Sequence, residues 1–107
     1  MSAVTQIDPA GLKGKMDARE SFCLLDVREP WEIALASIPG RLASPMHELP
    51  TRLKELDAAA PIIVMCRSGA RSQRAAEYLA ARGFAASNLR GGITAWSREI
   101  DPDVPEY

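Results

Sequence analysis

Cys66 combines a reactive side chain with the position at which α/β folds place reactive groups. It ends an uncharged, β-branched run that starts at Pro61, and a short polar loop containing a glycine follows it. The carboxyl end of a buried parallel strand is a favoured ligand position, because loop amides and the positive end of the next helix form an anion site there. The same field stabilises a thiolate. We therefore predict that Cys66 is a nucleophile with a pKa below the usual thiol value of about 8.5.

The loop that follows supplies the residue types that such a site needs. Gly69 lets the backbone curl without a side-chain clash. Arg67 and Arg71 flank the loop and are predicted to hold an incoming anion. Ser68 and Ser72 are predicted to donate hydrogen bonds, and a nucleophile that is already ionised needs no general base. The candidate site is the segment Cys66-Arg67-Ser68-Gly69-Ala70-Arg71-Ser72.

The distribution of charge favours a small anion as the ligand. The net charge of −1 argues against general nucleic-acid binding. Between Cys66 and Arg98, however, the chain carries six arginines and one acid, Glu77. A locally positive region in a nearly neutral protein indicates a small anionic partner and not a polyanion.

Length and composition indicate one compact domain over residues 1–107. Apolar residues make up 47% of the chain and charged residues 25%, the ordinary balance of a soluble globular domain. No apolar run approaches the roughly 18–20 residues that cross a bilayer, and residues 1–6 lack the features of a secretory signal. Cys23 and Cys66 are too far apart to form a zinc-ligand pair. We expect a cytoplasmic protein with free thiols, no metal site and no cofactor.

The hydrophobic pattern predicts a parallel sheet covered by helices on both faces, the α/β class. Strands are predicted over residues 22–27, 42–44, 61–66 and 87–89. Helices are predicted to start at Pro9, with Asp8 as N-cap, and at Pro30, to run over residues 47–57, and to follow both the polar loop and Gly91-Gly92.

Four motifs, in order along the chain, resemble those of single-domain rhodaneses, which are thiosulfate-type sulfurtransferases. They are Leu25-Asp26-Val27-Arg28-Glu29, Ile38-Pro39-Gly40, the loop from Cys66 to Ser72, and Gly91-Gly92-Ile93-Thr94-Ala95-Trp96. The resemblance covers the chain from Ile7 onward. It implies a three-layer α/β/α sandwich with a five-stranded parallel sheet.

The resemblance also implies a double displacement at Cys66. Cys66 attacks the outer sulfur of a donor such as thiosulfate, sulfite leaves, and Cys66 carries a persulfide that the loop amides cradle. Cyanide, a small thiol or a protein then accepts the sulfur. A cysteine desulfurase or a small sulfur-carrier protein can serve as the cellular partner. By this resemblance Cys66 is catalytic, and the substrate is bound by Arg67, Ser68, Gly69, Ala70, Arg71 and Ser72.

Two further segments bear on the resemblance. Ser37 stands where relatives often have His before Ile38-Pro39-Gly40, and we interpret this position as structural. Residues 100–107 also resemble the tail of rhodanese domains fused to E1-like adenylyltransferases that sulfurate small carrier proteins.

Two other functions compete with sulfur transfer. Related phosphatases and arsenate reductases place five residues between cysteine and arginine, whereas four separate Cys66 from Arg71, and Ser72 fills the place of the arginine. The shorter loop suits a single sulfur atom better than a phosphate. A non-catalytic binding or sulfur-relay module is the other alternative, although such modules often lack the nucleophile that this chain keeps.

The remaining residues whose side chains could take part in catalysis or binding are predicted to have structural roles. Cys23 lies within a strand. If this strand and the one that ends at Cys66 are parallel neighbours, Cys23 lies about 10 Å below the strand end, too far for a strain-free disulfide. His47 is predicted to be a surface or capping residue. The pattern predicts an ion pair or loop brace for Asp26 and Arg28, and packing roles for Trp31 and Trp96.

Overall fold

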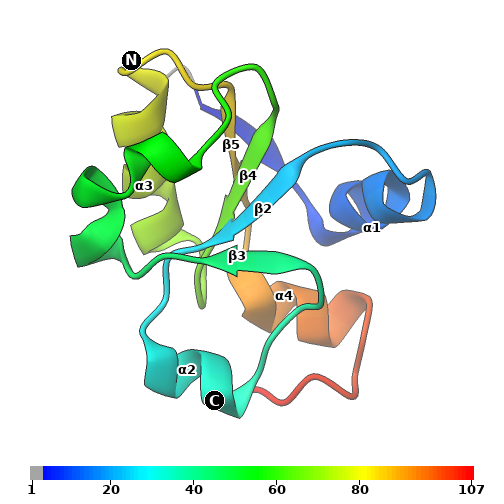
Figure 1. Cartoon of the computed structure of the whole chain (residues 1–107). Coiled ribbons are helices and arrows are strands. Elements are labelled where there is room, and N and C mark those ends of the chain that lie inside the picture. Colours follow the sequence, from blue (N-terminus) through cyan, green and yellow to red (C-terminus); the bar gives the residue numbers. More distant parts are fainter. Residues whose placement is uncertain (1–3) are drawn as a thin grey trace.

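Five short strands run parallel in a single sheet, in the spatial order β1-β5-β4-β2-β3. The computed structural model describes residues 4–107, so part of the N-terminal stretch from which we predicted no secretory signal, residues 1–3, lies outside the described residues. The strands are β1 (Thr5–Ile7), β2 (Cys23–Asp26), β3 (Arg41–Ala43), β4 (Ile62–Met65) and β5 (Ala86–Leu89). Figure 1 shows this sheet edge-on between two groups of helices.

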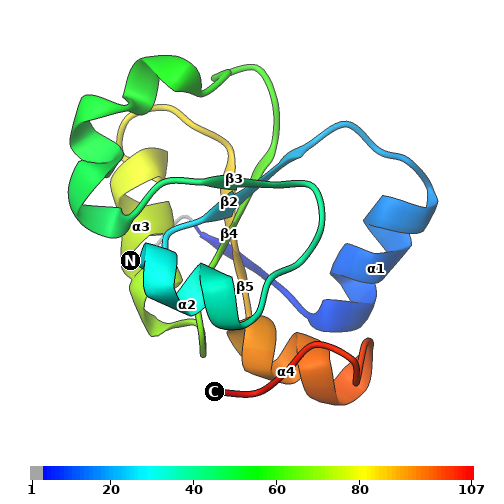
Figure 2. The same ribbon diagram turned by 60° about the horizontal axis from the view of Figure 1, so that its bottom comes forward.

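Helices cover both faces of the sheet, which confirms the predicted three-layer α/β/α sandwich. The α-helices are α1 (Pro9–Asp17), α2 (Pro30–Leu35), α3 (Ala70–Ala80) and α4 (Gly92–Glu99), and two 3-10 helices are η1 (Met46–Thr51) and η2 (Leu53–Glu55). In Figure 2 the α3 and 3-10 helices lie on one side of the strands, and α1 and α4 lie on the other. The short helix α2 lies at the edge where the strands end (Figure 1).

The central strand β4 contributes to both cores, as its continuous apolar run predicts. Ile62 and Val64 pack with Cys66 against the α3 side, whereas Ile63 and Met65 join the core formed with α1 and α4. Successive side chains of a strand point to opposite faces, so a strand covered on both faces is apolar throughout. Cys66 continues this alternation and is 1% exposed.

The structure differs from the predicted elements in three places. Residues 47–57 form short 3-10 turns instead of one α-helix, because Pro50 lies inside the segment and has no amide to donate. Strand β1, which the pattern did not predict, pairs only with β5 at the sheet edge. Helix α3 begins at Ala70, so the last three residues of the predicted loop, 70–72, form its first turn.

The start of α4 holds the backbone that follows β4. The amide of Ile93 donates to the carbonyl of Cys66 (3.0 Å), and the amide of Thr94 donates to that of Arg67 (3.1 Å). Gly92 makes this approach possible, because its φ is +59° and an added Cβ would collide with the Arg67 carbonyl and lie 2.6 Å from that of Cys66. The two carbonyls are therefore drawn toward α4.

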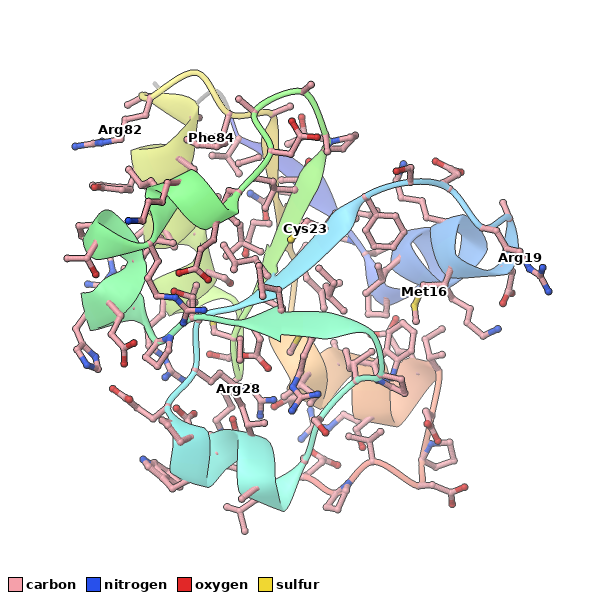
Figure 3. All side chains as sticks on the ribbon, viewed as in Figure 1. Met16, Arg19, Cys23, Arg28, Arg82 and Phe84 are labelled. Atoms are coloured by element: carbon pink, nitrogen blue, oxygen red, sulfur yellow. The ribbon has the colours of Figure 1, made fainter. Side chains whose placement is uncertain are left out.

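A buried ion pair fixes the end of β2 against α2. Arg28 bonds Asp26 at 2.8 Å, and both side chains are fully buried. The guanidinium also donates to the carbonyl of Ala36, which follows α2 (2.8 Å). Figure 3 shows Arg28 in the space between the sheet and α2. The predicted pairing of Asp26 with Arg28 is thus confirmed.

A second ion pair connects α2, α3 and the C-terminal tail. Arg71 binds Glu32 through two hydrogen bonds of 2.7 and 2.8 Å. The Tyr107 hydroxyl donates to Glu32 (2.9 Å) and accepts from Arg28 (3.0 Å). Hydrogen bonds from Arg71 lower the pKa of Glu32 to about 2, despite the opposing effect of burial. Residues far apart in the sequence therefore form one charge-balanced network.

We expect Gly92→Ala to destabilise the fold by about 2 kcal/mol or more, because a methyl group would strike backbone that neighbouring hydrogen bonds hold in place. Urea denaturation measures the change in the free energy of unfolding. Gly14→Ala is the matched control. Gly14 lies in α1 with open space around its Cα, so alanine there should stabilise by about 0.5–1 kcal/mol. Equal effects of the two variants would contradict this role of Gly92.

Acid should weaken the fold through Glu32. Because its pKa is lower when folded than when unfolded, the stabilisation is complete above pH about 4.3 and is lost as the pH falls to about 2. The loss amounts to about 3 kcal/mol. Urea denaturation at several pH values should show this slope, and Glu32→Gln should flatten it. Glu106→Gln, in an exposed pair with Arg98, is the control and should leave the slope unchanged.

Candidate active site

The backbone after Cys66 curls tightly around its sulfur atom. Residues 67–69 form the turn, and Gly69 completes it with a φ of +105°, as its predicted role requires. The amide of Gly69 donates to Cys66 Sγ (3.1 Å), and the amide of Ser72 donates to it from the first turn of α3 (3.4 Å). The expectation that loop amides face the sulfur is confirmed by these contacts.

The hydrogen bonds around Cys66 favour its thiolate. Burial raises the pKa of the Cys66 thiol, but hydrogen bonds from the Ser72 hydroxyl and from the amides of Ser72, Gly69 and Ser68 outweigh this effect. The pKa of Cys66 therefore lies below its ordinary value. A charge on Sγ is stabilised here by the Ser72 hydroxyl and by fixed peptide dipoles, and the peptide dipoles need no reorganisation when the charge forms.

Ser72 links the sulfur to β5 through Asn88. The Ser72 hydroxyl lies 3.2 Å from Cys66 Sγ and 2.6 Å from Asn88 Oδ1, and all three side chains are buried. Asn88 Nδ2 donates to the carbonyl of Gly69 (3.3 Å) and to Gln6 Oε1 (2.9 Å). Sequence reasoning missed Asn88. A polar amide within a short strand that ends beside the active loop is the signal that could have revealed it.

The two arginines of the loop have different surroundings. The guanidinium of Arg71 is occupied by Glu32, and this bond raises the pKa of Arg71. Arg67 is exposed, and its guanidinium lies 5.0 Å from the centroid of the Tyr107 ring. Glu32 and Tyr107 were not predicted. Glu32 has the appearance of an ordinary helix-capping acid, because it closes a capping box with Glu29.

The two remaining loop residues, Ser68 and Ala70, lie at the surface. The amide of Ser68 is among the groups that stabilise the Cys66 thiolate. No side-chain hydrogen bond from Ser68 to the sulfur accompanies this amide contact among the described residues.

Cys23 is separate from the site, as predicted. It pairs in register with Ile62, four positions before Cys66 along β4, and both cysteines are free. Burial raises the pKa of Cys23, so this thiol is held neutral. Figure 3 shows Cys23 on β2, within the sheet and away from Arg28 at the strand ends.

The other predicted positions divide between surface and core. The side chain of His47 is 67% exposed and lies 3.6 Å from two glutamates, which confirms its surface location. Trp96 is buried and packs as predicted, whereas Trp31 is 64% exposed. The predicted packing of Trp31 is reduced to an edge contact with Tyr107, with ring centroids 6.2 Å apart. Among residues 4–107, no three potential metal-ligating side chains cluster together.

No helix within the described part of the chain has the length and apolarity needed to cross a bilayer.

The chain is similar in sequence to proteins of two kinds, one of about its own length and one much longer. A protein named "Sulfurtransferase" from Allochromatium vinosum is 43% identical over 102 residues, which cover 94% of this chain and 95% of that protein. "Adenylyltransferase and sulfurtransferase MOCS3" from Arabidopsis thaliana is 32% identical over 124 aligned positions. This match spans 100% of the present chain but 27% of that longer protein.

Solved structures support the same relationship. The crystal structure of a rhodanese-related protein from Thermoplasma volcanium is similar with a TM-score of 0.84 and 33% identity. The match covers 96% of this chain and 99% of that one. The Rhodanese-like domain family model matches residues 8–99, which include the Cys66 loop and both ion pairs. Because the match extends over nearly the whole sequence and the whole fold, the chain belongs to the rhodanese-like domain family.

Proposed function

We propose that this protein is a sulfurtransferase that carries sulfane sulfur on Cys66 as a persulfide. The observation that supports the proposal most is the environment of Cys66 Sγ, which accepts hydrogen bonds from the amides of Gly69 and Ser72. Such an environment stabilises a thiolate without a general base. The name of the Allochromatium vinosum relative agrees with sulfur transfer.

The reaction takes place in two displacements. The Cys66 thiolate attacks the outer sulfur of a thiosulfate-like donor, the Sγ–S bond forms, and the S–S bond of the donor breaks. Sulfite leaves with the bonding electron pair, and the negative charge of the enzyme moves to the outer sulfur. A nucleophilic acceptor, cyanide or a thiol, then attacks the outer sulfur. The Sγ–S bond breaks, and its electron pair returns to Cys66 as the thiolate.

The residues of the loop have different roles in this proposal. The amides of Ser68, Gly69 and Ser72 bind the sulfur that carries charge. Arg67 provides an exposed positive charge at the entrance for the anionic donor. Arg71 acts mainly through its pair with Glu32, which anchors the first turn of α3. The free cysteines agree with a reducing compartment such as the cytoplasm.

A protein is the acceptor that we favour in the cell. The match to part of a longer protein named for both adenylyltransferase and sulfurtransferase activity motivates this choice. A phosphatase reaction has less support, since Ser72 fills the place of the phosphate-binding arginine and the neighbouring Arg71 guanidinium is already bound to Glu32. Cys66-dependent hydrolysis of an aryl phosphate would overturn this ranking.

Thiosulfate should load one sulfur atom onto the protein, detectable by intact mass, and cyanide should remove it as thiocyanate. Cys66→Ser should abolish the mass gain because it removes the nucleophile. Cys23→Ser is the matched control and should retain full loading, because Cys23 is remote from the loop. Loading that persists in Cys66→Ser would refute the proposed intermediate.

The ionisation of Cys66 should be visible as thiolate ultraviolet absorbance during a pH titration. We expect a midpoint below that of an ordinary thiol after subtraction of the Cys66→Ser spectrum, because hydrogen bonds stabilise the charged form. The remaining thiol, Cys23, should ionise above that value. A Cys66 midpoint at or above the usual value would show that its surroundings do not activate it.

A further inference from the structure

We propose that Asn88 is a positioning residue that competes with Cys66 for the single hydroxyl proton of Ser72. By accepting this proton, Asn88 favours the forms of Cys66 in which Sγ carries no charge. The consequence for sulfur transfer rests on the proposed function, whereas the competition itself rests on the hydrogen-bond geometry.

The orientation of the Asn88 amide is fixed by its neighbours. A backbone carbonyl can only accept a hydrogen bond, so the group that faces the Gly69 carbonyl must be Nδ2. Nδ2 also donates to Gln6 Oε1. Asn88 Oδ1 is therefore the atom that faces the Ser72 hydroxyl, at 2.6 Å, and it can only accept.

The Ser72 hydroxyl has two acceptors and one proton. When it donates to Asn88, a lone pair of its oxygen faces Cys66 Sγ at 3.2 Å, which suits an S–H donor. When Cys66 is a thiolate, the hydroxyl proton is drawn to Sγ, and Asn88 Oδ1 loses this partner. Asn88 is 4% exposed and Ser72 is fully buried, so a lost hydrogen bond carries a real cost.

This competition opposes the thiolate and supports the persulfide. In the first displacement the negative charge leaves Sγ for the transferred sulfur, and the Ser72 proton can return to Asn88. In the second displacement the charge returns to Sγ, and the proton turns back. Asn88 therefore adjusts the balance between the charged resting thiolate and the sulfur-loaded enzyme.

The charged groups around Cys66 are held independently of Asn88. Arg71 interacts electrostatically with Cys66 from α3 and is bound to Glu32 of α2. Tyr107 of the tail bonds Glu32, and burial raises the pKa of Tyr107, so its hydroxyl stays protonated. Replacing Asn88 leaves these groups in place, and a change in Cys66 ionisation can be assigned to the hydroxyl.

The test is a double-mutant cycle on Cys66 ionisation in the full chain, read by thiolate absorbance. Asn88→Ala frees the Ser72 proton for Sγ and should raise the ionisation constant of Cys66 about three- to tenfold. In the Ser72→Ala background the same substitution should give no such rise. If Asn88→Ala acted instead by loosening the loop, the ionisation constant of Cys66 would change in both backgrounds, because the hydrogen bond from Asn88 to Gly69 is lost in each.

Asn88→Asp provides a second variant if Asn88→Ala does not fold. Aspartate keeps the acceptor and strengthens it, so the ionisation constant should fall, and it should fall further with Ser72 present than in Ser72→Ala. For Asn88→Ala, a rise in the ionisation constant that is absent, reversed or equal in both backgrounds overturns the proposal. For Asn88→Asp, a fall that is absent or equal in both backgrounds does the same. The titration needs no sulfur donor, so the competition can be demonstrated even if the mass experiment refutes the persulfide.

Discussion

The hydrogen bonds from the start of α4 to the carbonyls of Cys66 and Arg67 are the constraint on which the site depends. A peptide group has a carbonyl at one end and an amide at the other, so the bond from Thr94 to the Arg67 carbonyl turns the Ser68 amide of the same peptide group away from α4, and this amide is among those that stabilise the Cys66 thiolate. Gly92 permits the approach, and Gly69 completes the curl. The anion site is therefore formed by α3, α4 and the end of β4 together, and not by the loop alone.

The electrostatics of the site come mainly from peptide dipoles and only secondarily from arginine charges. Asp26 balances Arg28, and Glu32 balances Arg71, so these two cations serve to hold α2, α3 and the tail together. Removing one partner of such a pair leaves a buried charge without compensation, which is why these contacts order the surroundings of the loop. The exposed Arg67 is then the loop cation available to an approaching anion.

Burial and hydrogen bonding act in opposite directions on Cys66, and the hydrogen bonds prevail. How far the pKa of Cys66 falls depends on Ser72, whose hydroxyl faces both the sulfur and Asn88. A site that held the thiolate too firmly would lose the nucleophilicity that sulfur transfer needs, because nucleophilicity falls as the thiol pKa falls. Sharing one hydroxyl proton between Cys66 and Asn88 is a physical means of setting the pKa of Cys66.

Local signals in the sequence determined the α/β class, the strand that ends at Cys66, the glycine of the turn, and the pairing of Asp26 with Arg28 two residues away. Each depends on alternation, on backbone conformation or on near neighbours. Glu32 with Arg71, Tyr107 with Glu32, and Ser72 with Asn88 were decided by the tertiary structure alone, because these partners are 39, 75 and 16 residues apart. A side chain's type states which bonds it can make, but the packing of helices on the sheet selects the partner and thereby whether an arginine binds substrate or supports the fold.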